Sequence, residues 1–182
     1  QVGLQVYLDP WGIGGVFGGE AYSNFLIHHR DAWQIDQYGN FQPRACLRNP
    51  EFMSYMRTWI ASAVKLGADC VFWDEPKLTF PSFTNVQESS SCYCNQCKNE
   101  FEEKYSYPIC AAPADRIQTF QEESLINFIG FMSQEVKSRG LKNAICFAPP
   151  PLSSSTPAIW HQIATAPAID ILGVTPYWGL VE

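Results

Sequence analysis

Short apolar runs alternate along the chain with longer segments in which apolar residues recur every three or four positions. Four of these runs, at residues 2–8, 70–73, 143–148 and 169–174, are nearly continuous. Such runs are typical of strands that are buried on both faces, as in a parallel sheet. Each run is followed within a few residues by proline, which cannot donate to a strand ladder, so each predicted strand ends there.

The segments between the runs have a helical period and clear ends. Asn49-Pro50-Glu51 supplies an N-cap, a first-turn proline and a carboxylate that complements the helix dipole, and Gly67 ends the same helix. Further helices are predicted through residue 105, over about 114–139, and from about residue 157. The apolar stripes of the first and longest helices are Phe52, Met53, Met56, Trp59, Ile60, Ala63 and Val64, and Ile117, Phe120, Leu125, Phe128, Met132 and Val136.

The alternation of strands and helices predicts an α/β fold with parallel strands and right-handed crossovers. The 182 residues suit one domain, so residues 1–182 are treated as a single unit. No hairpin signal stands out, and residues 11–47, rich in glycine and aromatic side chains, are predicted to form a long irregular loop with a function. Because ligand sites in α/β sheets lie at the carboxyl ends of the strands, the groups that follow each run are expected on one rim.

The composition narrows the class of ligand. Charged residues make up 16% of the chain and aromatic residues 14%, which suits a neutral polar ligand such as a sugar. The formal net charge is −6 and no run of Lys or Arg occurs, so neither nucleic acid nor an anionic membrane surface is expected as a partner. No apolar stretch approaches the roughly 20 residues that a membrane span needs.

Seven cysteines provide the clearest chemical motif. Cys92, Cys94 and Cys97 have the spacing of metal ligands, and together they can bind one tetrahedral Zn2+ if a fourth ligand comes from elsewhere. Cys46 is the favoured fourth ligand because it is expected to be exposed in a polar context, and Cys110 is the alternative. A disulfide with free thiols competes with this interpretation, but a chain of this size does not need a disulfide scaffold, so we expect a reducing, cytoplasmic compartment. Two further cysteines inside apolar strands are expected to be buried hydrophobic residues: Cys70 and Cys146.

A pair of carboxylates follows the second apolar run. Glu75 comes directly after Trp73 and Asp74, where partial loss of solvent would suit it to general acid catalysis. The structural alternative, a helix cap or a salt bridge at the rim, is the commoner role of a lone strand-end glutamate. Asp74 points to the opposite face if strand pairing persists, so the two carboxylates need not act together. A third interpretation makes both of them ligands of a divalent metal ion.

Aromatic residues also gather at the predicted strand ends. Trp11, Trp73, Tyr177 and Trp178 could stack on the faces of sugar rings, although each of them could equally belong to the core. These residues are the candidate carbohydrate contacts. No role is assigned to the three histidines: His28, His29 and His161.

The order of these motifs resembles the glycoside hydrolase family 42 β-galactosidases and their relatives. The matching parts are residues 46–52 (Cys-Leu-Arg-Asn-Pro-Glu-Phe), the strand end Trp73-Asp74-Glu75, and Cys92-x-Cys94-x-x-Cys97 followed by Phe101 and Tyr105. In that family a cysteine precedes an Asn-x-Pro-like helix start, a strand ends in Asn-Glu, and an insertion supplies three further zinc ligands. The resemblance covers about residues 2–178.

The resemblance implies that the chain is the central part of a (β/α)8 TIM barrel, with the four runs as strands 3 to 6 and a zinc-binding insertion at about residues 77–113. Glu75 would be the general acid/base of a hydrolase that cleaves a β-glycoside, such as a β-galactoside, with retention. Tyr177 matches a tyrosine that is common after the sixth strand. The implied ligands of a structural Zn2+ are Cys46, Cys92, Cys94 and Cys97.

The chain departs from the family in two respects. Asp74 stands where the family has Asn, whose amide would bind a sugar hydroxyl, and an ionised Asp cannot donate a hydrogen bond. The nucleophile of the family lies on the seventh strand, so we expect this segment alone to be inactive and to self-associate through two unpaired edge strands. The rival interpretation is a catalytically silent, zinc-stabilised barrel that binds carbohydrate without hydrolysing it.

Overall fold

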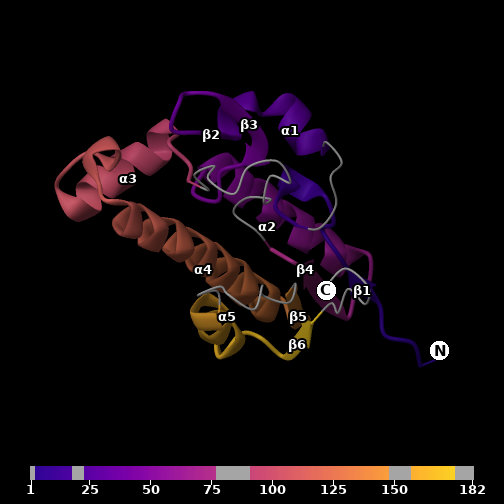
Figure 1. Cartoon of the computed structure of the whole chain (residues 1–182). Coiled ribbons are helices and arrows are strands. Elements are labelled where there is room, and N and C mark those ends of the chain that lie inside the picture. Colours follow the sequence, from indigo (N-terminus) through magenta and orange to yellow (C-terminus); the bar gives the residue numbers. More distant parts are fainter. Residues whose placement is uncertain (1–2, 18–22, 77–90, 148–156, 175–182) are drawn as a thin grey trace, which may run out of the picture.

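The computed structural model describes residues 3–17, 23–76, 91–147 and 157–174 (Figure 1). All neighbouring strands of its main sheet are parallel. Each strand lies inside, or within one residue of, the apolar run that predicts it, so the predicted α/β class is confirmed. The strands, in their spatial order, are β1 (Tyr7–Leu8), β4 (Cys70–Asp74), β5 (Lys142–Phe147) and β6 (Ile171–Val174).

The spatial order of these strands is also their order along the chain, with β1 and β6 as the outer strands of the described sheet. The register pairs Tyr7 with Cys70 and Cys70 with Lys142, so the strands begin at a similar level. Their carboxyl ends therefore meet at one edge of the sheet. Asp9 follows β1 at this edge, and Glu75 follows β4.

Four helices correspond to the predicted ones. In Figure 1, α3 lies near one end of the long helix α4, and the sheet lies near the other end. Since α4 leads directly into β5, it connects the cysteine-rich region to the sheet. The four helices are α2 (Pro50–Lys65), α3 (Asn95–Tyr105), α4 (Ala114–Ser138) and α5 (Pro157–Ala164).

The ends of α2 show why its sequence folds there. The side-chain oxygen of Asn49 accepts hydrogen bonds from the backbone N–H groups of Glu51 (2.9 Å) and Phe52 (3.0 Å), which satisfies two donors of the first turn. After the helix, Gly67 has a φ of +78°, the left-handed conformation that ends many helices. Both expected ends of this helix are confirmed.

The main core lies between the sheet and the helices α2 and α4. Phe52 of α2 stacks on Phe128 of α4 with ring centroids 5.5 Å apart, and Phe17 contacts Phe128 at 6.0 Å and Trp73 of β4 at 5.3 Å. Each of these buried aromatic side chains contributes about 1.5–3 kcal/mol through its burial. Val64 departs from the predicted stripe, because it lies at the margin of α2 and is 38% exposed.

Residues 11–47 contain more regular structure than the sequence predicts. The turn between two antiparallel strands is built by Asp36, whose Oδ1 accepts hydrogen bonds from the backbone N–H groups of Tyr38 (2.9 Å) and Asn40 (2.8 Å). The expectation of no hairpin is therefore wrong. The turn is formed by a carboxylate and lacks the Asn-Gly pair that usually marks a hairpin in a sequence. The elements formed here are α1 (Asn24–His28), β2 (Trp33–Ile35) and β3 (Phe41–Ala45).

Candidate functional site

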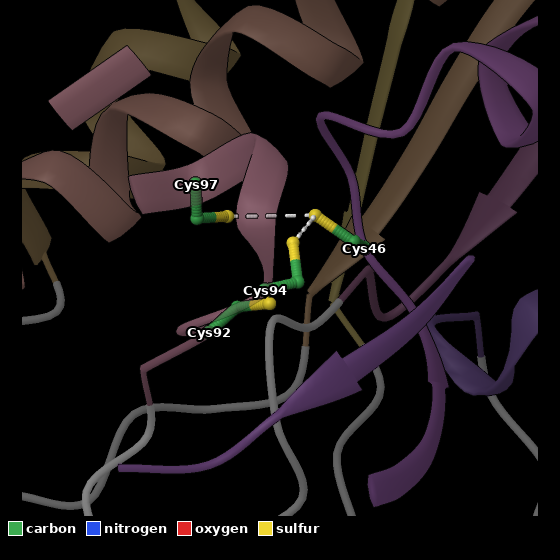
Figure 2. A group of neighbouring side chains, drawn as sticks. All are labelled: Cys46, Cys92, Cys94 and Cys97. Carbon is green, nitrogen blue, oxygen red and sulfur yellow. Dashed lines mark hydrogen bonds between the residues drawn. The ribbon is translucent and has the colours of Figure 1, made fainter. Parts of the chain in front are cut away.

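The four cysteines of the predicted metal site lie together in the structure (Figure 2). Cys46 follows β3, Cys92 and Cys94 precede α3, and Cys97 lies in the first turn of α3. All four are buried, and their Sγ atoms lie within 4.8 Å of one another. The Sγ atom of Cys46 is 3.5 Å from that of Cys97 and 3.6 Å from that of Cys94. Two distant parts of the chain therefore form one cluster, and Cys46 is its fourth member.

Hydrogen bonds hold the two parts of the cluster in place. The backbone N–H of Cys46 donates to the carbonyl of Ala32 (2.8 Å), and that of Tyr93 donates to the carbonyl at the end of β2 (2.6 Å). The side-chain amide of Gln121, on α4, donates to the carbonyl of Cys92 (3.3 Å). The cysteine-bearing loop is thus attached to both the hairpin and α4, which orients its thiols toward one another.

The thiols strongly influence one another's ionisation. Hydrogen bonding to Cys46 lowers the pKa of Cys94 and raises the pKa of Cys97. The pKa of Cys46 itself is raised, chiefly by hydrogen bonding to Cys92. Four buried thiolates at these separations would repel one another, so the fully ionised cluster needs a cation to balance its charge.

The donor set fits a tetrahedral metal ion. With metal–sulfur bonds of about 2.3 Å, tetrahedral thiolates lie about 3.8 Å apart. The observed Sγ separations of 3.5 and 3.6 Å are close to that value. The four buried cysteines could therefore hold a metal ion. A shell of four thiolates leaves no position for a catalytic water, which suits a structural role.

The remaining cysteines do not join this cluster. Cys70 and Cys146 are buried within β4 and β5, as their apolar surroundings predict, and Cys110 is exposed. All seven cysteines are free thiols in the structure. The competing interpretation, a disulfide within the cysteine trio, therefore receives no support.

Carboxylates gather at the carboxyl edge of the sheet. Glu75, the first residue after β4, is only 3% exposed, and its backbone N–H donates to the carbonyl of Cys146 (2.9 Å). Its φ of +39° lies in the left-handed region, which is unfavourable for a residue with a Cβ atom. Asp74 is still paired within the sheet, opposite Cys146, whereas Glu75 lies just beyond the strand in the left-handed conformation.

Asp9 follows the first apolar run, so the sequence places it on the same rim as Glu75, although it gives this carboxylate no catalytic role. Its Oδ1 is inaccessible to solvent and has no hydrogen-bond partner among the described residues. Burial and the neighbouring Asp74 raise the pKa of Asp9 to about 6, while a hydrogen bond from the backbone N–H of Trp11 opposes this rise. The structure agrees with this placement, because Asp9 follows β1 just as Glu75 follows the adjacent strand β4.

The aromatic candidates differ in their placement. Trp11 is 56% exposed and lies beside Asp9, so it remains available to a ligand. Trp73 is fully buried, and its indole N–H donates to Oδ1 of Asn143 (2.6 Å). The expectation that Trp73 contacts a sugar is therefore wrong, because this side chain is part of the core between the sheet and its helices. Tyr177 and Trp178 lie outside the described residues.

No protein-family model matches the chain. The search of curated proteins also finds no match. No helix in the described ranges is long and apolar enough to span a membrane. Asp74 and Glu75 belong to no group of three or more potential metal ligands in the described part of the chain.

Proposed function

We propose that this chain is part of a carbohydrate-active (β/α)8 barrel of the glycoside hydrolase type, in which Glu75 is the general acid/base that acts on a β-glycoside. The observation that carries the proposal is the state of Glu75, which is 3% exposed and has a φ of +39° at the carboxyl end of an inner strand. Strained residues with a Cβ atom concentrate at functional sites, where the surrounding structure holds them. A buried carboxyl group at this edge is placed as a proton donor would be.

The surroundings of Glu75 favour a neutral polar ligand. Asp9, with its pKa raised to about 6, provides a second carboxyl group at the same edge of the sheet. Trp11, more than half exposed beside Asp9, offers an aromatic face to the apolar side of a sugar ring. Together these groups supply the hydrogen bonding and the stacking surface on which carbohydrate sites depend.

The topology supports the barrel. Parallel strands that follow one another in space and in sequence are the repeating unit of a (β/α)8 barrel, and the four strands in the order β1-β4-β5-β6 have this arrangement. They would be strands 3 to 6. A retaining mechanism also needs a nucleophilic carboxylate about 5–5.5 Å from the acid/base, which the resemblance assigns to a seventh strand.

Leaving-group dependence tests the role of Glu75. The experiment uses the full-length protein, including any residues that flank this chain. Glu75→Gln should lower its kcat/KM for unactivated β-glycosides by about 10²–10⁴-fold. The effect should be much smaller for aryl glycosides with acidic leaving groups, because these need little protonation. Glu103→Gln, at an exposed position of α3, is the control and should leave both rates unchanged.

Three outcomes of this experiment are informative. Equal loss on both classes of substrate would show that Glu75 binds the substrate or supports the structure of the site, and does not donate a proton. Binding of β-glycosides in calorimetry without any turnover would favour the silent carbohydrate-binding barrel. Absence of both binding and turnover over a panel of β-glycosides would overturn the proposal.

For the cysteine cluster we propose a structural Zn2+ ion held by Cys46, Cys92, Cys94 and Cys97. A tetrahedral set of four thiolates is typical of Zn2+ or of iron–sulfur centres, and the closed, buried set found here suits zinc bound without a water. The ion would connect the end of β3 to the start of α3. Its binding energy would add to the stability of the fold, because the unfolded chain does not preorganise the site.

Metal analysis of the purified protein tests the identity of the ion. We expect one zinc per cysteine cluster, released by a chelator with a fall in the melting temperature. Cys46→Ser should abolish this zinc, whereas Cys110→Ser, at the exposed thiol, should retain it. Iron with a visible sulfide charge-transfer band, or a disulfide between Cys92 and Cys97, would contradict the assignment.

A further inference from the structure

A second group of potential metal ligands lies at the protein surface, apart from the thiols and from the carboxyl edge of the sheet. His29 follows α1, Asp31 lies in the turn after it, and Glu51 lies in the first turn of α2. One ligand atom from each of these residues lies within 4.8 Å of the others. Nδ1 of His29 and Oε2 of Glu51 form a hydrogen-bonded pair 3.0 Å apart.

The structure holds the imidazole ring of His29 and the backbone of Glu51 in place. The imidazole ring of His29 stacks on the ring of Phe25 with centroids 4.5 Å apart and an interplanar angle of 15°. Phe25 is itself 2% exposed and packs against Phe52, so the histidine ring rests on the core. Glu51 follows the N-cap of α2, whose backbone is fixed by Asn49. Such support reduces the entropy that a ligand must overcome when it orders the site.

The charges around the group favour a cation. With neutral His29, the two carboxylates give the group a formal charge of −2. The nearest basic residue along the chain, Arg30, is held over the rings of Trp33 (5.5 Å) and Phe41 (5.3 Å). Its guanidinium therefore interacts with the hairpin, and not with the carboxylates.

We propose that His29, Asp31 and Glu51 form a metal site for a divalent first-row transition ion. Two carboxylates alone would favour a hard cation such as Mg2+ or Ca2+, and the imidazole nitrogen shifts the preference toward Zn2+ and similar ions. In such a site, with bonds of about 2.0–2.2 Å, neighbouring ligand atoms lie about 3–3.5 Å apart, which small side-chain rotations can reach. Three protein ligands leave a position for water, so this ion would exchange readily. It would connect the end of α1 to the start of α2.

Titration with Zn2+ tests the site directly. Tag-free protein, already saturated with one equivalent of Zn2+ at its thiols, is titrated with further Zn2+ in calorimetry. We expect one additional ion per chain, and His29→Ala or Glu51→Gln should weaken its binding by at least about tenfold. The matched control is His28→Ala, because this neighbouring exposed histidine lies outside the group and its loss should change nothing.

Paramagnetic broadening gives an independent measurement in the folded protein. Added Co2+ should broaden the amide resonances of residues 29–32 and 51–52 before any others, and should fail to do so in Glu51→Gln. The proposal is overturned if no ion binds beyond the thiol site, if both variants bind the extra ion as tightly as the parent protein, or if His28→Ala abolishes binding. A failure here leaves the assignments of Glu75 and of the thiol cluster untouched, because they involve other residues.

Discussion

Replacing Asp9 by asparagine should stabilise the protein at neutral pH. Burial and Asp74 raise the pKa of Asp9 from 3.8 to about 6, so the folded state binds this proton more tightly than the unfolded chain does. Below about pH 4 both states are protonated, and Asp9 has no effect on the free energy of unfolding. As the pH rises from about 4 to 6, the unfolded state releases its proton first and stability falls, and the penalty is complete above about pH 6.

The magnitude follows from the pKa values. A rise from 3.8 to about 6 corresponds to about 3 kcal/mol, and partial exposure of the carboxyl group reduces this to about 1–2 kcal/mol. Asparagine has nearly the same shape, and its side-chain oxygen can still accept the hydrogen bond from Trp11. Asp9→Asn should therefore raise the free energy of unfolding by about 1–2 kcal/mol at pH 7, which is roughly 2–8 °C in Tm, and by nearly nothing at pH 4.

Urea unfolding from about pH 2.5 to 8, followed by tryptophan fluorescence, measures this difference. Asp170→Asn is a control of opposite sign, because the salt bridge to Lys137 (2.6 Å) lowers the pKa of Asp170. That variant should lose stability at pH 7, and the loss should fade as the pH falls through the folded-state pKa. The reasoning is refuted if Asp9→Asn is no more stable than the parent protein at pH 7, or if its advantage is the same at pH 4.

Two further predictions concern packing. Gly14→Ala should lower the free energy of unfolding by about 2–5 kcal/mol, because Gly14 has a φ of +66° and an added Cβ would lie 2.6 Å from the ring of Phe52. Gly39→Ala is the control. Gly39 has a φ of +87° but open space around it, so its loss should cost only about 1–2 kcal/mol. Equal losses in urea unfolding would show that no steric clash exists. Arg48→Lys should cost about 2 kcal/mol in thermal unfolding, because a lysine ammonium cannot match the guanidinium hydrogen bond to Ser124 (2.7 Å) and its stacking on α4. A lysine variant of parent stability would mean that charge alone suffices.

The sequence predicts the helices and strands of the sheet layer well because their signals are local and repeated. Asn49 and Gly67 mark both ends of α2 by side-chain and backbone chemistry that needs no tertiary contact. The cysteine cluster is also predictable, since the spacing of Cys92, Cys94 and Cys97 already restricts the three thiols to one small region. The choice of Cys46 depended on an expected exposed, polar position and on the resemblance. The structure places Cys46 beside the trio, but in a buried position.

The predictions from sequence fail where contacts between distant parts of the chain determine the local structure. The hairpin escapes detection because β2 has only three residues and its turn depends on the carboxylate of Asp36. Trp73 was expected at a ligand because it ends an apolar run, but β4 is covered on the side of Trp73, where Asn143 satisfies the indole N–H. His29 received no role because Glu51, its partner, lies 22 positions away in the sequence.

Contacts in the sheet differ widely in how much chain separates them, and this sets how long each strand waits for its partner during synthesis. The hydrogen bond that joins β1 to the start of β4, from Val6 to Asp69, spans 63 positions, whereas that between β5 and the residue before β6, from Asn143 to Asp170, spans 27. The corresponding difference in loop-closure entropy is only about 0.7 kcal/mol. At about 5–20 residues per second, however, a ribosome needs roughly 3–13 s to deliver the partner of β1. Throughout that interval β1 lacks the strand that pairs with it in the described sheet, whereas β5 receives β6 after a much shorter stretch of chain.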